Sequence, residues 1–238
     1  MGEKTKIEWS DASLNFYLGC QKVSPGCKNC YAERVMKRMG RKYDFNVLHK
    51  TNWENIIKML MKLPPSRIFA NSMTDMFIEK LNDQEILDMI HVLKQFPQHQ
   101  FLILTKRIER ASQFVNDYGL AENIWLGTSI ENKQTRDKRL PVLRNIKNVA
   151  IKFISFEPLL EDITPVDLTH IDWTIVGGES GSGFRPFDID WARKIRIECT
   201  KQNVAFFFKQ VGGFRPTDGG RLLDGKTYDE IPVLRWKT

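Results

Sequence analysis

The sequence lacks the features that place a chain in a membrane or send it out of the cell. No apolar run in its 238 residues reaches the roughly 18 residues that a membrane-spanning helix requires. Charged residues stand at the start of the chain, Met1 to Lys6, with no apolar segment behind them, so we expect no signal peptide. We therefore expect a protein of the cytoplasm, where thiols stay reduced.

Cysteine is scarce and unevenly distributed. The chain has four, and Cys20, Cys27 and Cys30 fall within eleven residues with the spacing C-x6-C-x2-C. Three clustered thiols and one remote thiol form a poor disulfide framework and a good metal framework. A [4Fe–4S] cluster held by three thiolates has one iron open to a substrate or cofactor. The sequence therefore predicts an enzyme built around an iron–sulfur cluster.

A structural zinc ion is the alternative for the same cysteines. Such sites usually have four protein ligands, and no second C-x2-C follows in the chain. His49 is the nearest histidine and is the candidate fourth ligand. The six-residue gap with its Pro25-Gly26 turn favours a loop that wraps around a cluster.

Long alternating strands are also missing, and short continuous apolar runs take their place. Continuous apolar character over four to six residues is typical of strands buried on both faces in a parallel sheet. We expect strands at Leu14–Leu18, Arg67–Asn71, Gln100–Thr105, Ile124–Ser129, Ile151–Phe156, Trp173–Val176 and Val204–Phe208.

Helical patterns lie between these runs. Tyr31, Val35 and Met39 recur at a spacing of four, and Asp83 can cap a helix that follows it. Cys199 shares a helix face with Ile195, so we expect it to be a buried apolar contact outside the site. Strand–helix alternation predicts an α/β fold, a complete or partial (β/α) barrel with the cysteine loop after the first strand.

The end of the chain differs in character. It is rich in glycine, and Asp224-Gly225 is a hairpin signal. We expect a barrel domain over residues 1–211, with a cluster-binding loop at 19–31, and a C-terminal β-hairpin appendage over 212–238.

Neither common phosphate-binding fingerprint is present. The glycine-rich loop Gly177–Gly183 does not match G-x-G-x-x-G and contains no P-loop lysine. Glycines after a strand still allow a ligand close to the backbone. We expect Gly177, Gly178 and Glu179 to contact a cofactor, with Arg185 nearby as a cation for a carboxylate or phosphate.

Most other predicted strands also end in polar residues, which indicates one shared mouth. The mixture of charges suits a zwitterionic small molecule: Asp75, Glu131, Glu157 and Glu179 with Lys106, Arg107 and Lys209. The three glutamates among them also fit a glycosidase, in which two carboxylates divide the acid and nucleophile roles, but that alternative gives the cysteines no role.

The charge is unevenly distributed too. The net charge is +7, and residues 28–50 hold seven Lys and Arg against two acids. A basic surface gains affinity for nucleic acid through counterion release, so an anionic substrate is favoured.

Several motifs together resemble a known family. They are GCQKVSPGCKNCYAER at 19–34, NSMTDMF at 71–77, SFEPLL at 155–160, GGESG at 177–181 and FFFKQ at 206–210. They resemble a phage-encoded three-Cys-motif family of uncharacterised activity, and over nearly the whole chain. A phage-encoded protein would work in the cytoplasm of its host.

More distantly, the arrangement is similar to radical S-adenosylmethionine enzymes. That resemblance implies a partial (β/α) barrel, a [4Fe–4S] cluster on Cys20, Cys27 and Cys30, and S-adenosylmethionine on the open iron. The chain departs from the superfamily pattern: its first cysteine gap is x6 where C-x3-C is usual, and Tyr31 follows the last cysteine. Gly177-Gly178-Glu179 follows a late strand, whereas the superfamily places its Gly-Gly-Glu after the second.

The resulting prediction is a radical S-adenosylmethionine-type enzyme that acts on a nucleic acid or nucleotide, in repair or base modification, with a reductant protein as partner. Asp75, Glu131, Gly177, Gly178 and Glu179 are the expected cofactor contacts. The expected substrate contacts are Lys106, Arg107, Arg185 and Lys209. The alternative is a non-enzymatic nucleic-acid-binding protein stabilised by zinc or an inert cluster.

Overall fold

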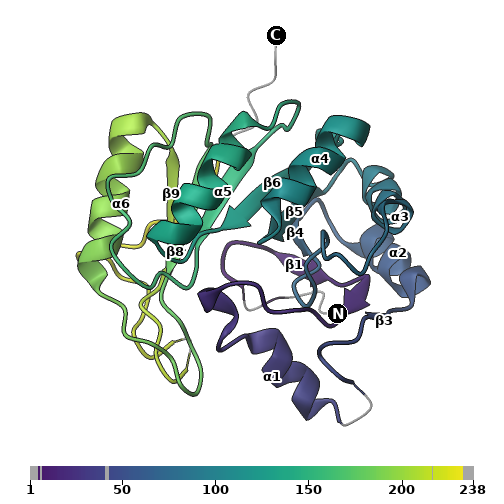
Figure 1. The fold of residues 1–238 in the computed structure, drawn as a ribbon, viewed down its shortest axis with the longest axis horizontal. Coiled ribbons are helices and arrows are strands. Elements are labelled where there is room, and N and C mark those ends of the chain that lie inside the picture. The colour runs from purple at the N-terminus through teal and green to yellow at the C-terminus, as the bar shows by residue number, and fades with distance from the viewer. Residues whose placement is uncertain (1–4, 6, 41–42, 216, 233–238) are drawn as a thin grey trace. The chain divides into compact units, whose positions relative to one another are not determined.

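The computed structural model describes residues 5, 7–40, 43–215 and 217–232. The chain divides into two compact units (Figure 1). Unit 1 comprises Met1–Val23, Cys30–Leu126 and Ile146–Ala150, and unit 2 comprises Ser24–Asn29, Gly127–Asn145 and Ile151–Thr238. The residues behind the signal-peptide expectation, apart from Thr5, and positions 216 and 233–238 of the expected appendage lie outside the described residues.

The α/β class expected from the sequence is confirmed. Seven strands are hydrogen-bonded in the order β1-β4-β5-β6-β7-β8-β9, the open order of a partial barrel with β1 and β9 at its edges. β1 pairs in parallel with β4 and β4 with β5, as do β7 with β8 and β8 with β9. The strands are β1 (Ala12–Leu14), β4 (Arg67–Ala70), β5 (Gln100–Thr105), β6 (Ile124–Ser129), β7 (Lys152–Phe156), β8 (Trp173–Gly177) and β9 (Ala205–Gln210).

The expected first strand, Leu14–Leu18, is divided in two, and this is a correction. β1 ends at Leu14, and β2 (Tyr17–Leu18) pairs antiparallel with β3 (His49–Lys50). Side chains take the backbone groups between them: Phe16 N donates to Asn71 Oδ1 at 2.9 Å, and Thr51 Oγ1 donates to Asn15 O at 2.7 Å. These side-chain contacts replace the hydrogen bonds between strands at residues 15 and 16. The apolar run at 14–18 therefore does not show that the strand is interrupted there.

Four helices accompany the strands in the described part of unit 1, and the last three of them along the chain are grouped around β1, β4 and β5 (Figure 1). They are α1 (Tyr31–Arg38), α2 (Trp53–Lys62), α3 (Asp83–Lys94) and α4 (Ile108–Tyr118). The expected cap of α3 is wrong by one residue. Asn82, not Asp83, caps it, because its side chain accepts from Glu85 N while Glu85 accepts from Asn82 N, each at 2.9 Å.

Unit 2 is centred on three strands of apolar side chains. β7 and β8 are buried at every position, and Trp173 packs between Phe153 and Phe207 with ring centroids 5.8 and 6.2 Å away. Helix α6 (Ile189–Gln202) packs along β8 and β9, and α5 (Lys133–Asn145) follows β6. These aromatic contacts add to area burial and join β7, β8 and β9 to one another.

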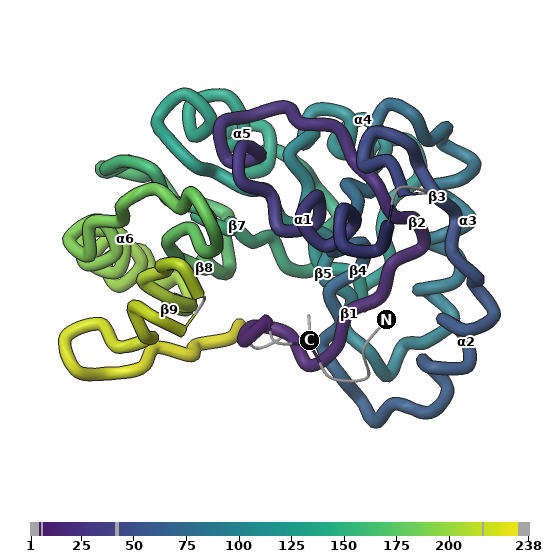
Figure 2. Tube along the Cα trace, turned by 90° about the horizontal axis from the view of Figure 1, so that it is seen from below, coloured from purple at the N-terminus to yellow at the C-terminus, as the bar shows by residue number. Residues whose placement is uncertain are grey.

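The C-terminal segment turns at Asp224-Gly225, where both residues have positive φ and Leu223 and Lys226 exchange backbone hydrogen bonds of 2.9 and 3.1 Å. Beyond the turn, the chain runs antiparallel along β9, with Phe207 opposite Asp229 (Figure 2). The division into a domain over 1–211 and an appendage over 212–238 stays a prediction. Among the described residues, none of the helices has the length and apolar character needed to cross a bilayer.

The contact between β6 and β7 gives a test of packing. A Cβ added at Gly127 would lie 2.5 Å from the ring of Phe153, which is fully buried. We expect Gly127→Ala to lower the free energy of unfolding by about 1–3 kcal/mol, the cost of overpacking. Urea unfolding measures it. Phe153→Leu added to Gly127→Ala is the control, because the smaller side chain makes room. A double variant as unstable as the sum of the two single variants contradicts this account.

Candidate metal and cofactor site

Cys20 and Cys30 belong to unit 1 and pack against one small apolar cluster. The cluster consists of Ala32, Met36, Phe45 and Met73, with both cysteines at its edge. The backbone of Cys20 is fixed by its amide, which donates to Phe45 O at 2.7 Å, and Cys30 is the residue before α1. All three clustered cysteines are free and half-buried. Burial, followed by the charge of Asp75, raises the pKa of the Cys20 thiol.

A buried ion pair lies near Cys20. Asp75 follows β4, Arg107 follows β5, and their charged groups are 3.2 Å apart with side chains only 8% and 5% exposed. Arg107 also binds Glu79 at 2.7 Å and donates to Gln21 O, one residue after Cys20, at 3.3 Å. The arginine therefore connects the end of β5 to the first cysteine.

Asp75 was expected to contact a cofactor. Its Oδ1 accepts from Thr105 Oγ1 at 2.6 Å and from Phe77 N at 3.0 Å, and its Oδ2 accepts from Lys106 N at 2.9 Å as well as from Arg107. Four acceptor positions are the usual capacity of a carboxylate. In the structure all four acceptor positions of the Asp75 carboxylate are occupied by protein donors. The cofactor contact stays a prediction.

Cys27 belongs to unit 2, in the segment Ser24–Asn29. A short 3-10 helix, η1 (Pro25–Cys27), carries it, with Pro25 at its first position, where the missing amide costs nothing. The Ser24 hydroxyl lies 3.7 Å from the Cys27 sulfur and donates to Glu131 Oε1 at 2.6 Å. Gly26 lies against Glu131 so closely that an added Cβ would be 2.5 Å from its Cγ.

Glu131 follows β6 and is fully buried. Its Oε2 accepts from Arg139 Nη1 at 2.9 Å, and the same nitrogen donates to Ser129 O at 2.7 Å. A buried carboxylate must be paired to remain charged. A cofactor contact at Glu131 stays a prediction; in the structure this carboxylate binds Ser24 of the segment that carries Cys27.

Glu179 holds the other end of the same segment. Its carboxylate receives two guanidinium hydrogen bonds from Arg185, of 2.6 and 2.9 Å, and one from the Asn29 amide of 2.9 Å. Asn29 also donates to Gly183 O at 2.7 Å. Burial alone would raise the pKa of Glu179, but the hydrogen bonds from Arg185 and Asn29 outweigh it and lower that pKa.

The remaining predicted residues have protein partners as well. Gly178 lies against the residue that follows β9, because an added Cβ would be 1.9 Å from Val211 O, and one on Gly177 would be 2.9 Å from Glu157 Oε1. Lys209 forms an ion pair of 2.9 Å with Glu157. The backbone amide of Lys106 binds Asp75. Arg107 and Arg185, expected to hold substrate, are thus paired with carboxylates, and Lys209 is too.

Sequence reasoning missed Ser24, Asn29 and Arg139. Ser24 and Asn29 lie within the motif, but serine and asparagine in a turn usually serve the turn itself. Their partners are 107 and 150 residues away. Arg139 lies on α5, where a charged residue is ordinarily solvated.

Three free thiols are the donor chemistry that an iron–sulfur cluster requires, so the residues fit such a group. Among the described residues, no three or more His, Cys, Asp and Glu side chains are gathered as metal ligands. The His49 ring, considered for zinc, lies 3.2 Å from Asp44 O and edge-on to Tyr43.

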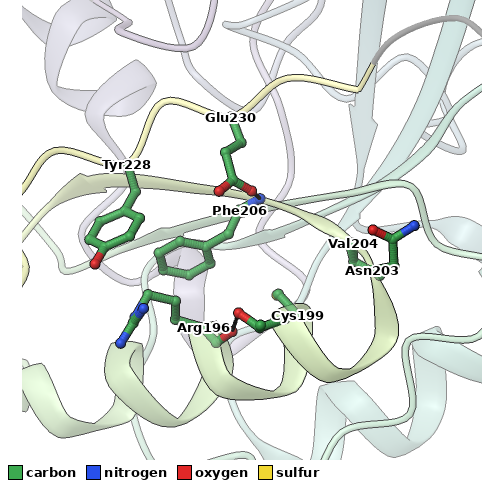
Figure 3. Close-up of a pocket in the computed structure, with 8 residues that line it drawn as sticks. Arg196, Cys199, Asn203, Val204, Phe206, Tyr228 and Glu230 are labelled. Atoms are coloured by element: carbon green, nitrogen blue, oxygen red, sulfur yellow. Dashed lines mark hydrogen bonds between the residues drawn. The ribbon is translucent and has the colours of Figure 1, made fainter.

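A pocket of about 240 Å³ lies elsewhere in unit 2, lined by α6 and the C-terminal segment (Figure 3). Arg196 stacks over Tyr228 on one side, and Glu230 accepts from Phe206 N at 2.9 Å on the other. Cys199 lines the pocket too. It is buried, as expected from its helix face, and its sulfur contacts Thr174 Oγ1 at 3.1 Å. It therefore takes no part in the cysteine site.

These features define a parallel (β/α) protein whose ionisable groups gather where strands end. A family model described as "Protein of unknown function (DUF5131)" matches residues 4–232, so the chain belongs to this family. No curated protein matches it.

Among solved structures, the chain is similar to spore photoproduct lyase. A cysteine-to-serine mutant of that protein has a TM-score of 0.47 at 14% identity, over 83% of this chain and 63% of the other. Its complex with dinucleoside spore photoproduct has a TM-score of 0.44 at 14% identity, over 78% and 60%. A mutant with bound AdoMet and the same dinucleoside has 0.45 at 14%, over 79% and 61%. The match thus spans about three fifths of that protein's length.

The Asp75–Arg107 pair gives a stability prediction. Asp75→Asn removes the charge that compensates a buried guanidinium, and we expect a loss of about 3 kcal/mol, because Glu79 still pairs with Arg107. Chemical unfolding of the wild type and the Asp75→Asn variant measures this loss. Glu79→Gln is the matched control: its exposed ion pair should be worth about 1 kcal/mol or less. Equal losses in the two variants would contradict the distinction between a buried and an exposed partner.

Cys199 gives a prediction about pH. Burial raises the pKa of its thiol to about 12, so near pH 8.5 it remains protonated and a poor nucleophile. We expect iodoacetamide at that pH to leave Cys199 unmodified in the folded protein, as read by mass spectrometry. Urea-unfolded protein is the control, in which all four thiols react. If folded Cys199 were modified as fast as Cys27, its thiol would be neither shielded from the reagent nor raised in pKa.

Proposed function

We propose that this protein is an iron–sulfur enzyme of the radical S-adenosylmethionine type. In this proposal Cys20, Cys27 and Cys30 hold a [4Fe–4S] cluster, and S-adenosylmethionine binds the open iron. Such a pair supplies radical chemistry, in which one-electron cleavage of the sulfonium leads to hydrogen abstraction from a substrate. The protein's part is to hold the thiolates, orient the substrate and exclude water.

The observation that carries the proposal is the set of three free thiols in one short segment. They are half-buried, which limits the access of water to them. Cys20 and Cys30 share one apolar support, and the backbone around Cys27 is fixed by hydrogen bonds to buried carboxylates. Disulfide bonds are absent from the described cysteines, and reduced thiols are consistent with the cytoplasmic location that we propose.

The proposed substrate is a nucleic acid or nucleotide, modified or repaired at a base. Its support is the net charge of +7 and the basic run at 28–50. Arg107, Arg185 and Lys209 are paired with carboxylates, so a phosphate would have to compete for them. A reductant protein must supply the electron, and we include a phage origin in the same proposal because of the motif resemblance.

The test is anaerobic reconstitution with iron and sulfide, followed by EPR of the reduced protein with and without S-adenosylmethionine. We expect a cluster signal that changes when the cofactor is added, because the cofactor binds the open iron. The same signal should be lost in Cys27→Ala and kept in Cys199→Ala, the matched control.

A cluster signal that ignores the cofactor would refute the radical mechanism. A protein that retains about one zinc ion per chain and takes up no cluster would favour a zinc-stabilised nucleic-acid-binding protein.

A further inference from the structure

We propose that Glu131 and Glu179 are positioning residues that hold the Cys27 segment, Ser24–Asn29, in place for metal binding. Sequence reasoning assigns both glutamates to a cofactor, and the contacts assign them to the protein's own loop. The metal part of this inference rests on the proposed function, whereas the positioning part can be tested without metal.

The segment has little means of holding itself. It spans six residues, and none of the residues in η1 is buried. Apolar burial is the usual source of order in a loop, and here it is nearly absent. Two internal backbone hydrogen bonds are present, from Cys27 N to Ser24 O at 2.9 Å and from Lys28 N to Pro25 O at 3.2 Å, with the long contact of 3.7 Å between the Ser24 hydroxyl and the Cys27 sulfur. One turn with these hydrogen bonds does not offset the entropy of fixing six residues.

Outside anchors therefore set its position, one at each end. At the start, the Ser24 hydroxyl donates to Glu131 at 2.6 Å, and Gly26 packs directly against the same side chain. At the end, the Asn29 amide bridges Glu179 and Gly183 O at 2.9 and 2.7 Å. Both acceptors are carboxylates paired with an arginine, and hydrogen bonds within such ion pairs are stronger than those between neutral groups.

Each carboxylate is in turn fixed from behind by an arginine. Arg139 holds the second oxygen of Glu131, and Arg185 holds Glu179 through two nitrogens. The two anchors thus have the same construction: a strand-end glutamate, an arginine that orients it and a polar residue of the cysteine segment. A carboxylate already engaged on both oxygens suits positioning better than it suits capture of a cofactor amine.

The first experiment is hydrogen exchange of the metal-free protein, read by mass spectrometry on peptides covering residues 24–29. Replacing Glu131 leaves Arg139 buried without its charge, so the variants are Ser24→Ala and Asn29→Ala instead. Each loses one hydrogen bond to a charged group, and we expect about tenfold faster exchange in the segment. The melting temperature should change little.

Two variants serve as controls. Val23→Ala lies in the same cysteine loop with a side chain 45% exposed, and it should leave exchange unchanged. Ser24→Thr keeps the hydroxyl at a position with extended backbone, φ −151° and ψ 166°, which threonine adopts readily, and should restore slow exchange. Wild-type exchange in both alanine variants would overturn the inference.

The second experiment is reconstitution of the same variants, with EPR read first without S-adenosylmethionine and then after it is added. Positioning predicts that Asn29→Ala takes up less iron or shows an altered reduced-cluster EPR signal, while Val23→Ala does not. An unchanged cluster signal, with loss only of the response to S-adenosylmethionine, would instead make this anchor a cofactor contact and overturn the inference. If even the wild type takes up no cluster, the proposed function fails, and exchange still decides whether the glutamates hold the loop.

Discussion

Pairing of buried carboxylates with arginine is the constraint on which the rest of the site depends. Asp75, Glu131 and Glu179 each follow a strand, each is less than a tenth exposed, and each meets a guanidinium. A lone charge at such depth would be prohibitively costly, so partner and position are fixed together. The Cys27 segment is attached to two of these pairs, at Ser24 and Asn29. Its geometry is therefore set by ion pairs at the strand ends more than by its own sequence.

Much of the fold was predictable because buried parallel strands have a simple signature. Runs of three to five consecutive apolar residues mark β5, β6 and β9 with errors of at most two residues at an end. The predictions that were wrong concern local competition. Asn71 and Thr51 take the backbone groups that would have continued β1, and they come from far along the chain. No pattern within residues 14–18 contains that information.

Helix α1 shows a different limit. The spacing of Tyr31, Val35 and Met39 predicts a helix, and a helix is present, but these three side chains are about 40% exposed. The buried positions are Ala32 and Met36, which give a weaker signal. Likewise, the predicted charged residues do stand at strand ends, whereas their partners could not be inferred. Arg139 lies eight residues beyond Glu131 on another element, and periodicity says nothing about such a pair.

The distance in sequence between the cysteine segment and its anchors has a consequence for biosynthesis. Ser24 and Asn29 lie 107 and 150 residues before their glutamates. At about 5–20 residues per second, a ribosome needs roughly 8–30 s to proceed from Asn29 to Glu179. Throughout that interval Cys27 is already made, but its segment has at most one of these two anchors. Metal that arrives on the nascent chain meets a flexible chelator, and only the finished chain can present a preformed site.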